Sequence, residues 1–254
     1  MHWRTNKNSL TDNYLKTNPD LILINSHGLK STEPLKIPGY KTYRINYSQT
    51  LADGSAIAIK HNIQHKLYDD FDFDVLAVEL QTNFGPIIIA TTYLPPRRPY
   101  LPYTDIFRLI NNNIPTYILG DFNARHTHFG NKDNNTVGKS MVKLINQGKM
   151  MHLGPYFPTF LHINSATIPD KIFSNKHHYL NFISEPGEIT TSDHIPIIFI
   201  LSTKPFITET PTIYKTNKAN WEQFKAILDN NITLTDLNKC HVEQIEKETA
   251  EWME

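Results

Sequence analysis

The fold of this chain is decided by the stretch Glu188-Ile189-Thr190-Thr191-Ser192-Asp193-His194-Ile195-Pro196-Ile197. Within it, Ser192-Asp193-His194 places a carboxylate beside an imidazole where a polar turn meets an apolar strand. Upstream, Gly120-Asp121-Phe122-Asn123 follows the apolar run Tyr117-Ile118-Leu119, and a further acidic position, Asp170, lies between the two motifs. Strand-end carboxylates, an amide and a histidine are the groups that metal-assisted attack on a phosphodiester requires. The sequence therefore predicts a phosphodiester-cleaving site.

Three motifs carry a resemblance to a known superfamily: GDFNARH (Gly120 to His126), IPD (Ile168 to Asp170) and TSDHIPI (Thr191 to Ile197). They resemble the endonuclease/exonuclease/phosphatase superfamily, and most of all the endonuclease domain at the front of a jockey-like non-LTR retrotransposon polyprotein. The resemblance runs in order from about Pro19 to Leu201. Further stretches that resemble this domain are Lys36 to Arg44, Asp53 to Lys60 and Ala90 to Pro99.

The fold class implied by the resemblance is α/β (α+β), a two-sheet β-sandwich flanked by helices, as in DNase I-like proteins. Residue patterns agree, because short apolar runs typical of strands outnumber helical patterns. The predicted strands are Leu21 to Ile24, Tyr40 to Arg44, Ala56 to Lys60, Val75 to Leu80, Pro86 to Tyr93, Thr116 to Leu119, Lys171 to Ser174, Tyr179 to Ser184 and Ile195 to Leu201. The predicted helices are Thr104 to Asn112 and Val137 to Gly148, the latter with Gly148 as its C-cap.

The net charge of the chain does not indicate a nucleic-acid-binding protein. Lys plus Arg and Asp plus Glu both number 25, so the formal net charge is zero. Contact with DNA would have to come from local patches, such as Arg97-Arg98 and the stretch from Arg125 to His128. The alternative is that both clusters are ordinary solvated loops. Four aspartates between Ile63 and Gln81 are interpreted as solvated charges of a hairpin connection.

Cysteine usage and hydropathy bear on the compartment. A single cysteine, Cys240, excludes an internal disulfide and a cysteine-rich zinc site. No apolar run approaches the ~20 residues that span a bilayer, and the N-terminus lacks the apolar stretch of a secretory signal. We therefore expect an intracellular protein, nuclear or cytoplasmic, that is not secreted and has no membrane partner.

The domain organisation changes near Leu201. We expect the endonuclease-like domain to span residues 1–202, a linker rich in Thr and Pro to span residues 203–217, and a helical segment to span residues 218–254. Trp221 and Phe224 fall on one helical face of that last segment. In the family that the chain resembles, such a segment precedes a reverse transcriptase, which is the partner domain implied downstream.

The Asp121 and Asn123 side chains are expected to point to one side of a strand edge, because Phe122 separates them and strand residues alternate. The alternative interpretation is an Asp-Asn turn at the end of a strand. The resemblance implies that Asp121 orients and deprotonates the attacking water and that Asn123 holds the water or a phosphate oxygen.

His194 and Asp170 are expected to form a pair. The resemblance makes Asp170 the partner of His194, and a carboxylate behind an imidazole favours the cation that stabilises charge on a phosphate. Without the resemblance, a Pro-Asp turn before a strand is the slightly favoured interpretation of Asp170. Tyr93 matches a phosphate-contacting tyrosine, and otherwise packs as a strand-end residue. Thr159 is expected to form part of the floor of the same site.

The metal side of the site departs from the family pattern. Asp193 is the expected ligand of a divalent metal, Mg²⁺ with Mn²⁺ as a substitute, because hard oxygen ligands are what the sequence offers. The family carries a metal-ligating Glu where this chain has Ser26, and His27 is a further candidate ligand. At the first motif, Arg4 stands where the family has an Asn.

Three functions remain open. The first is a magnesium-dependent endonuclease that nicks double-stranded DNA to prime reverse transcription. The second is a catalytically degenerate remnant that still binds DNA, motivated by Ser26 and Arg4. The third keeps the fold but acts on lipid or sugar phosphates.

Overall fold

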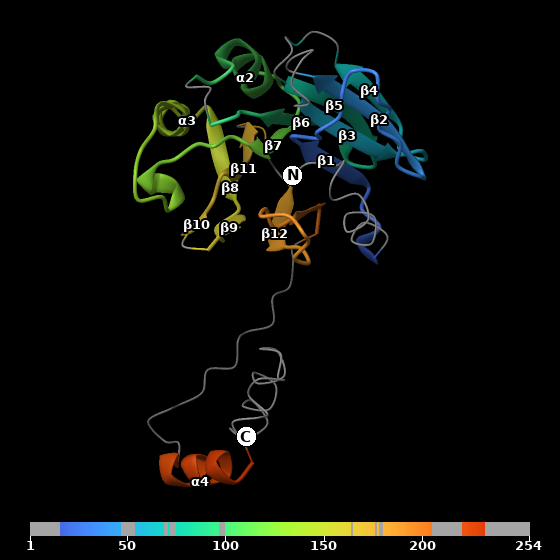
Figure 1. Cartoon of the computed structure of the whole chain (residues 1–254). Coiled ribbons are helices and arrows are strands. Elements are labelled where there is room, and N and C mark those ends of the chain that lie inside the picture. Colours follow the sequence, from blue (N-terminus) through green and yellow to red (C-terminus); the bar gives the residue numbers. More distant parts are fainter. Residues whose placement is uncertain are drawn as a thin grey trace. The chain divides into compact units, whose positions relative to one another are not determined.

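The computed structural model describes residues 16–46, 54–68, 71, 75–96, 100–163, 165–175, 177, 180–204 and 220–231 (Figure 1). The chain divides into two compact units, Met1–Phe206 and Ile207–Glu254. The first unit contains β1 (Leu21–Asn25), β2 (Tyr40–Asn46), β3 (Gly54–Lys60), β4 (His65–Tyr68), β5 (Val75–Thr82), β6 (Gly85–Tyr93), α2 (Tyr103–Ile110), β7 (Thr116–Asp121), η1 (Thr127–Phe129), α3 (Thr136–Asn146), β8 (Met150–Gly154), β9 (Phe160–His162), β10 (Ser165–Thr167), β11 (Asp170–Asn175), β12 (Asn181–Pro186) and β13 (Ile197–Ser202). The second unit contains α4 (Trp221–Asn231).

The larger sheet has the strand order β4-β5-β6-β7-β11-β8. Its neighbouring strands are antiparallel except for β6 and β7, which are parallel and connected through α2. A parallel pair needs such a crossover, because a tight turn cannot bring the chain back to the same end. The ends of β6 and β7 therefore lie at one edge of the sheet, where the pairing of β7 with β11 adds the start of β11.

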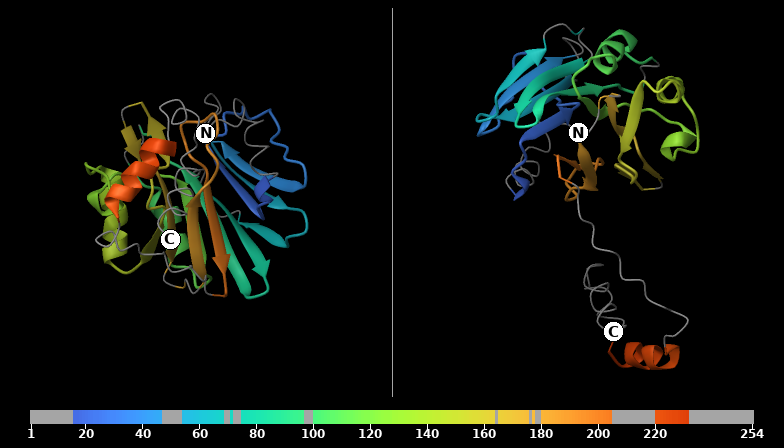
Figure 2. Two further views of the ribbon diagram at one scale, coloured as in Figure 1. Left: turned by 90° about the horizontal axis from the view of Figure 1, so that it is seen from below. Right: turned by 180° about the vertical axis from the view of Figure 1, so that it is seen from behind.

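A smaller sheet, β1-β3-β2, and the pair β12-β13 complete the sandwich. Alternate residues of β3 serve two cores, since Ile57 and Ile59 face the larger sheet while Ala56 and Ala58 pack against the opposite side. Side chains of β12 and β13 pack on the core between the sheets, and the view from below in Figure 2 shows this pair in orange beside the larger sheet. The expected two-sheet fold is confirmed.

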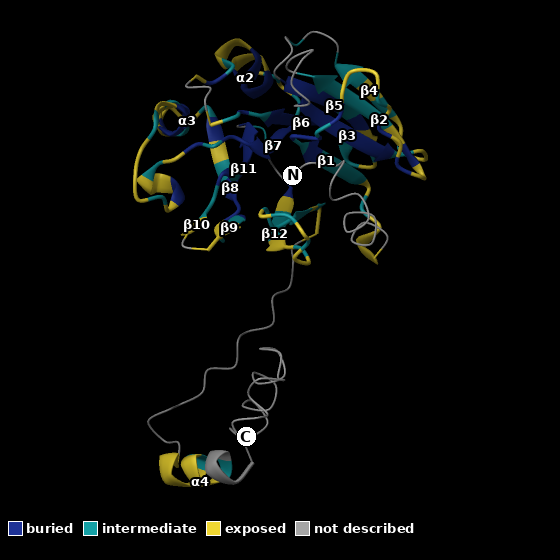
Figure 3. Ribbon diagram, in the orientation of Figure 1, coloured by how far each residue is buried: buried dark blue, intermediate teal, exposed yellow. Residues whose placement is uncertain are grey.

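Both predicted helices cover the outer face of the larger sheet. Ile106 and Leu109 of α2, with Met141 and Leu144 of α3, join the core formed with β5, β6, β7 and β11. In Figure 3 the inner sides of these helices are dark blue and their outer sides are yellow. The C-cap of α3 is Gln147, one residue before the predicted Gly148. Gly148 follows it with φ 64°, and its N–H donates to the Ile145 carbonyl at 2.8 Å, as is common for a glycine just after a C-cap.

Four strands were not predicted: β4, β8, β9 and β10. The residues of β8, Met150-Met151-His152-Leu153-Gly154, include no β-branched side chain, so their strand conformation comes from pairing with β11 rather than from local preference. The pairing of β4 with β5 shows that the segment after Ile63 begins a hairpin.

Several predictions fall on residues outside the described ranges. They concern Arg4, Arg97-Arg98, Cys240, the aspartates between Tyr68 and Val75, and most of the linker. The domain boundaries stay a prediction. Within the described residues, the helices are all too short or too polar to cross a membrane.

Candidate active site

The register of three strands assembles the site. Asp121 ends β7 and pairs with Asp170, the first residue of β11. On the other side of β7, Tyr93 ends β6 and pairs with Asp121. The sheet therefore brings three of the predicted site residues to one edge, although they are far apart in the sequence. Tyr93 is half-buried and belongs to this edge.

Asp170 holds His194 as predicted. Its Oδ2 lies 3.0 Å from His194 Nδ1, and the two side chains are 16% and 18% exposed. The same oxygen accepts a hydrogen bond of 2.6 Å from Thr159 Oγ1, and Thr159 is fully buried. Thr159 thus fixes the carboxylate that orients the imidazole, a contact more specific than the floor-shaping role predicted for it.

The segment around Thr159 also fixes the backbone of His194. Phe160 and His194 form an isolated antiparallel bridge. On either side of it, Ile195 N donates to the Thr159 carbonyl at 2.7 Å and Leu161 N donates to the Asp193 carbonyl at 2.8 Å. The position of His194 therefore depends on long-range pairing with β9, which local sequence patterns do not contain.

Asp121 and Asn123 meet, but for a different reason from the predicted one. Asn123 lies beyond β7 and adopts φ 46°, a left-handed conformation that Asn tolerates well, so the strand alternation does not extend to it. Its backbone N–H and its Nδ2 donate to Asp121 Oδ1 at 3.2 and 2.9 Å, and Nδ2 also reaches the Leu94 carbonyl at 2.9 Å. The expected strand geometry is wrong; the turn interpretation is closer, and it still joins amide and carboxylate.

Asn25, at the end of β1, is a site neighbour that sequence reasoning missed. Its amide nitrogen donates to the hydroxyls of Ser55 and Thr91 at 2.9 and 3.1 Å and to the Thr92 carbonyl at 3.3 Å, and its oxygen accepts from Asp121 N at 3.3 Å. This amide ties the smaller sheet to the end of β7. The only sequence signal was a polar residue closing an apolar strand.

The electrostatics of the site follow from burial and from the closeness of two carboxylates. Burial, and then the charge of Asp170, raise the pKa of Asp121 to about 7. Burial lowers the pKa of His194, but its hydrogen bond to Asp170 and the charges of Asp170 and Asp121 outweigh that effect, so the net shift is upward. The imidazole is thus favoured as a cation beside a carboxyl group that exchanges protons near neutral pH.

A metal ion would find one suitable group of donors in the described part of the chain. One donor atom each from Asp121, Asp170 and His194 lies within 4.8 Å of the others. Oxygen donors suit Mg²⁺, and a divalent cation would offset both the burial of the Asp121 carboxylate and the charge of Asp170, which raise the pKa of Asp121. The donor set therefore fits a divalent metal.

The two predicted metal ligands lie outside this group. Asp193 is exposed and its carboxylate accepts from Ser192 Oγ at 3.3 Å. His27 is fully buried; its Nδ1 accepts from Leu29 N at 3.0 Å and its Nε2 lies 3.3 Å from the Ile45 carbonyl. The structure gives His27 a packing role, because both ring nitrogens already face protein atoms.

The loop after Asn123 is held by asparagine side chains. Asn135 Oδ1 accepts from Arg125 N at 3.0 Å, and Asn135 Nδ2 donates to the Asn123 carbonyl at 2.7 Å. The exposed Arg125 guanidinium lies 3.3 Å from Asp133. The predicted basic cluster at Arg125 is thus an ordered surface loop anchored to the site.

Lys171, next to Asp170, was also missed. It is fully buried, its Nζ donates to the Ile168 carbonyl, and it lies 5.2 Å from the centre of the Phe129 ring. Burial lowers its pKa to about 8, against the charges of Asp170 and Asp121 that raise it. Lys171 therefore anchors the segment that leads into Asp170.

Comparisons with known proteins agree with this geometry. Residues 87–198, which include Asp121, Asp170 and His194, match the family described as Endonuclease-reverse transcriptase. The RNA-directed DNA polymerase from mobile element jockey of Drosophila funebris is 26% identical over 227 residues, which cover 86% of this chain and 25% of that protein. By sequence and fold, the chain is similar to the endonuclease part of jockey-like non-LTR retrotransposon proteins, as the motifs predicted.

Further relatives of this jockey-like chain support the same conclusion. The jockey polymerase of Drosophila melanogaster is 25% identical and covers 91% of the chain. The endonuclease domain of TRAS1, a telomere-specific non-LTR retrotransposon, is 20% identical, covers 76% of this chain and 91% of that one, and has a TM-score of 0.63, which shows the shared fold. The chain spans about a quarter of the length of the curated jockey polymerases it matches. The predicted enzyme class, a phosphodiesterase hydrolase, is confirmed at the level of the family.

Proposed function

We propose that this jockey-like domain is a divalent-metal-dependent endonuclease that nicks double-stranded DNA. The observation that carries the proposal is the cluster of buried Asp121 with half-buried Asp170 and His194, whose donor atoms lie within 4.8 Å of one another at the edge of the sheet. A second carboxylate close to a carboxylate–imidazole pair is suited to activating water and stabilising a charged phosphate.

Each side chain takes a role that its contacts support. Asp121 accepts the proton of the attacking water, and the Asn123 amide holds its Oδ1 in place. Asp170 orients His194 through Nδ1, which leaves Nε2 to donate to a phosphate oxygen as charge develops. Tyr93, at the adjacent strand end, contacts the phosphate.

The expected cofactor is Mg²⁺, with Mn²⁺ as a substitute, held by oxygen donors from Asp121, Asp170 and the nearby Asp193. When bound, it supplies positive charge that stabilises the leaving oxygen and the phosphate. The assignment of Asp193 follows from the family resemblance, since its carboxylate lies outside the cluster of three.

The nick is proposed to supply the 3′-hydroxyl from which a reverse transcriptase, encoded downstream in a longer polyprotein, primes synthesis. This role comes from relatives that are RNA-directed DNA polymerases and of which the chain spans about a quarter. The rival function is a remnant that binds DNA without cutting it, motivated by Ser26 where a metal-binding carboxylate is expected.

The deciding experiment is nicking of supercoiled plasmid by the purified chain with Mg²⁺ or EDTA, beside His194→Ala and the control His61→Ala. His61 is exposed in the turn between β3 and β4. Magnesium-dependent nicks made by the wild type and by the control, but not by His194→Ala, would support the proposal. A folded wild type that makes no nicks with Mg²⁺ or Mn²⁺, while Ser26→Glu does, would establish the remnant instead.

A further inference from the structure

Exposed aromatic rings gather on one part of the first unit. Among its described residues, the Tyr, Phe and Trp side chains classed as exposed are Tyr100, Tyr103, Phe107 and Tyr156. Tyr103 and Phe107 lie on α2, Tyr100 shortly precedes that helix, and Tyr156 shortly follows β8. Exposed large side chains elsewhere in this unit are aliphatic, such as Ile163 and Ile189. A cluster of exposed apolar side chains is typical of an interaction surface.

Two of these rings already form a stacked pair. Tyr103 and Phe107 lie one helical turn apart on α2, with ring centres 6.1 Å apart and planes inclined by only 17°. The ammonium group of Lys149 lies 4.7 Å from the centre of the Phe107 ring. The other side of α2, with Ile106, is buried. The outer face of α2 therefore offers flat rings next to a cation.

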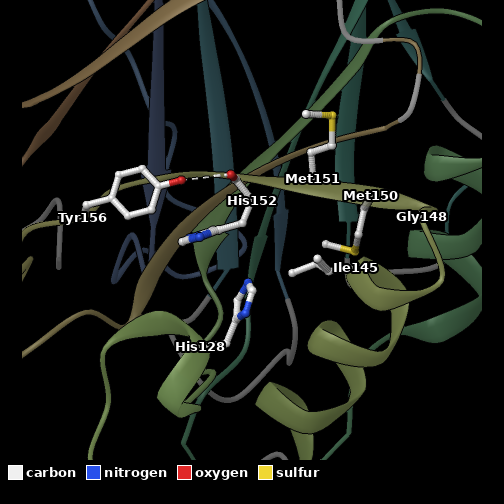
Figure 4. Close-up of a pocket in the computed structure, with 7 residues that line it drawn as sticks. All are labelled: His128, Ile145, Gly148, Met150, Met151, His152 and Tyr156. Carbon is white, nitrogen blue, oxygen red and sulfur yellow. Dashed lines mark hydrogen bonds between the residues drawn. The ribbon is translucent and has the colours of Figure 1, made fainter.

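Lys149 connects this pair to a pocket. The pocket, of about 610 Å³, is lined by His128, Ile145, Gly148, Met150, Met151, His152 and Tyr156. Figure 4 shows the rings of His128, His152 and Tyr156 on one side and the aliphatic and thioether side chains on the other. Gly148 lines the pocket and precedes Lys149 in the chain. The stacked pair and the pocket are thus neighbours along one surface.

One of the residues that line the pocket, His152, has a buried polar atom without a protein partner among the described residues. His152 Nε2 is buried and has no hydrogen-bond partner in the described part of the chain. Burial and the charge of Lys171 lower the pKa of His152 to about 4, so the ring is neutral near pH 7 and offers a hydrogen bond without a charge. The Tyr156 ring meets it edge-on at 5.2 Å, and the Tyr156 hydroxyl donates to the His152 carbonyl at 3.1 Å.

The charge of this surface favours an anionic partner. From residue 134 to residue 169 the sequence contains Lys139, Lys143 and Lys149 but no Asp or Glu. The carboxylate of α2, Asp105, is 2% exposed. In a chain with zero net charge, the stretch that includes α3 and β8 therefore carries three lysines and no acidic residue, and Lys149 lies beside the exposed rings. Rings on which bases stack, together with cations that contact phosphates, are how proteins bind single-stranded nucleic acid.

We propose that the surface formed by Tyr103, Phe107, Lys149 and the His152–Tyr156 pocket binds a single strand of nucleic acid. Bases stack on the Tyr103–Phe107 pair, Lys149 contacts the backbone, and one unpaired base enters the pocket beside the exposed ring of Tyr156. Paired bases would not present their faces to these rings, so a duplex fits poorly. A hydrophobic peptide would leave the lysines without a counter-charge. The proposal does not depend on the endonuclease activity.

The test is binding of a fluorescent oligothymidylate of about 20 nucleotides, long enough to cover a site of this type, to the full chain in EDTA, measured by fluorescence anisotropy. Tyr103→Ala with Phe107→Ala should weaken binding about tenfold or more, as the loss of stacked bases does elsewhere. Phe107→Trp should retain binding, because it keeps the ring. Ile200→Ala, an exposed substitution on β13, is the control and should change nothing.

Salt dependence and competitors complete the test. Lys149→Gln should lower the slope of log affinity against log salt by about 0.7, the value for one phosphate contact with a single strand. Tyr156→Ala reports on the pocket independently of α2 and should also weaken binding. Equal binding of the Tyr103–Phe107 double variant, with an unchanged melting temperature, would overturn the proposal. Equal competition by a duplex would also overturn it.

Discussion

His152 gives the chain a pH-dependent stability whose sign and size follow from its surroundings. Burial, followed by the charges of Lys171 and His128, lowers its pKa from 6.5 to about 4 in the folded protein. In the unfolded chain the pKa returns to the ordinary value. Between pH 6.5 and pH 4 the unfolded state therefore binds more protons than the folded state. The contribution of His152 to the free energy of unfolding is therefore complete above pH 6.5 and is lost as the pH falls from 6.5 to 4.

The size of this loss follows from the shift. Each pKa unit corresponds to about 1.4 kcal/mol, so the whole window represents about 3 kcal/mol, of which about 2 kcal/mol falls between pH 7 and pH 5. The assay is urea unfolding of the wild type and of His152→Gln at pH 7, 6 and 5. Because Gln does not titrate, the difference between the two proteins isolates His152 from the other groups that titrate in this range. The wild type should lose about 2 kcal/mol relative to His152→Gln on going from pH 7 to pH 5.

A difference that stays constant between pH 7 and pH 5 would refute this reasoning, since it would mean that His152 titrates alike in both states. Lys171→Met separates the causes. Burial is the larger cause and Lys171 the second, so this variant should reduce the pH dependence without abolishing it. Complete loss of the pH dependence in Lys171→Met would mean that charge, rather than burial, dominates.

Three further predictions concern the site and its support. Thr159→Val removes the 2.6 Å hydrogen bond to Asp170 and should reduce the rate of plasmid nicking about tenfold. Thr159→Ser keeps the hydroxyl and should retain the wild-type rate. Equal nicking rates for the Val and Ser variants would contradict a positioning role for Thr159. Gly120→Ala would place a Cβ 2.1 Å from the Thr92 carbonyl oxygen, so the free energy of unfolding should fall by on the order of 2 kcal/mol and the melting temperature by several degrees. An unchanged melting curve would show that β6 and β7 can move apart at little cost. Asn25→Ala removes the hydrogen bonds between this amide and the Ser55 and Thr91 hydroxyls and should destabilise the chain by about 1–3 kcal/mol in urea unfolding, whereas Asn25→Asp, which keeps an acceptor but not the amide donors, should not restore stability.

Much of the fold was accessible from local patterns. In β3, Ala and Ile alternate because one face meets the larger sheet and the other meets a second core, and such alternation is visible in the sequence. In β6 and β7, nearly continuous apolar runs mark strands that are buried on both faces. These patterns predicted the strands but not β8, which has weak local preference and depends on its partner β11.

The sequence predicted the site residues only where a recognised motif contains them. The pairing of Asp170 with His194 came from the family resemblance, and the geometry agrees. Thr159, Asn25 and Lys171 act through contacts between segments far apart in the chain, so spacing could not assign their partners. Asn123 shows the opposite error, because the period of a strand was extended past the end of β7 to a residue in a left-handed turn.

At Ser26 the chain differs from the family that it resembles, which has a metal-binding Glu there, and the structure indicates what Ser26→Glu would require. Ser26 follows β1, is 7% exposed, and adopts φ 54°. A left-handed conformation is unfavourable by about 1–2 kcal/mol for any residue with a Cβ, so Ser26→Glu adds no new backbone strain. The added burden is electrostatic, because Asp121 already has a raised pKa from burial and from the charge of Asp170. A third carboxylate near this edge would be destabilising without a cation and stabilising with one. Ser26→Glu should therefore lower the melting temperature in EDTA and raise its dependence on Mg²⁺ or Mn²⁺ above that of the wild type; a melting curve equally insensitive to metal in both proteins would mean that Ser26 does not face the metal side of the site.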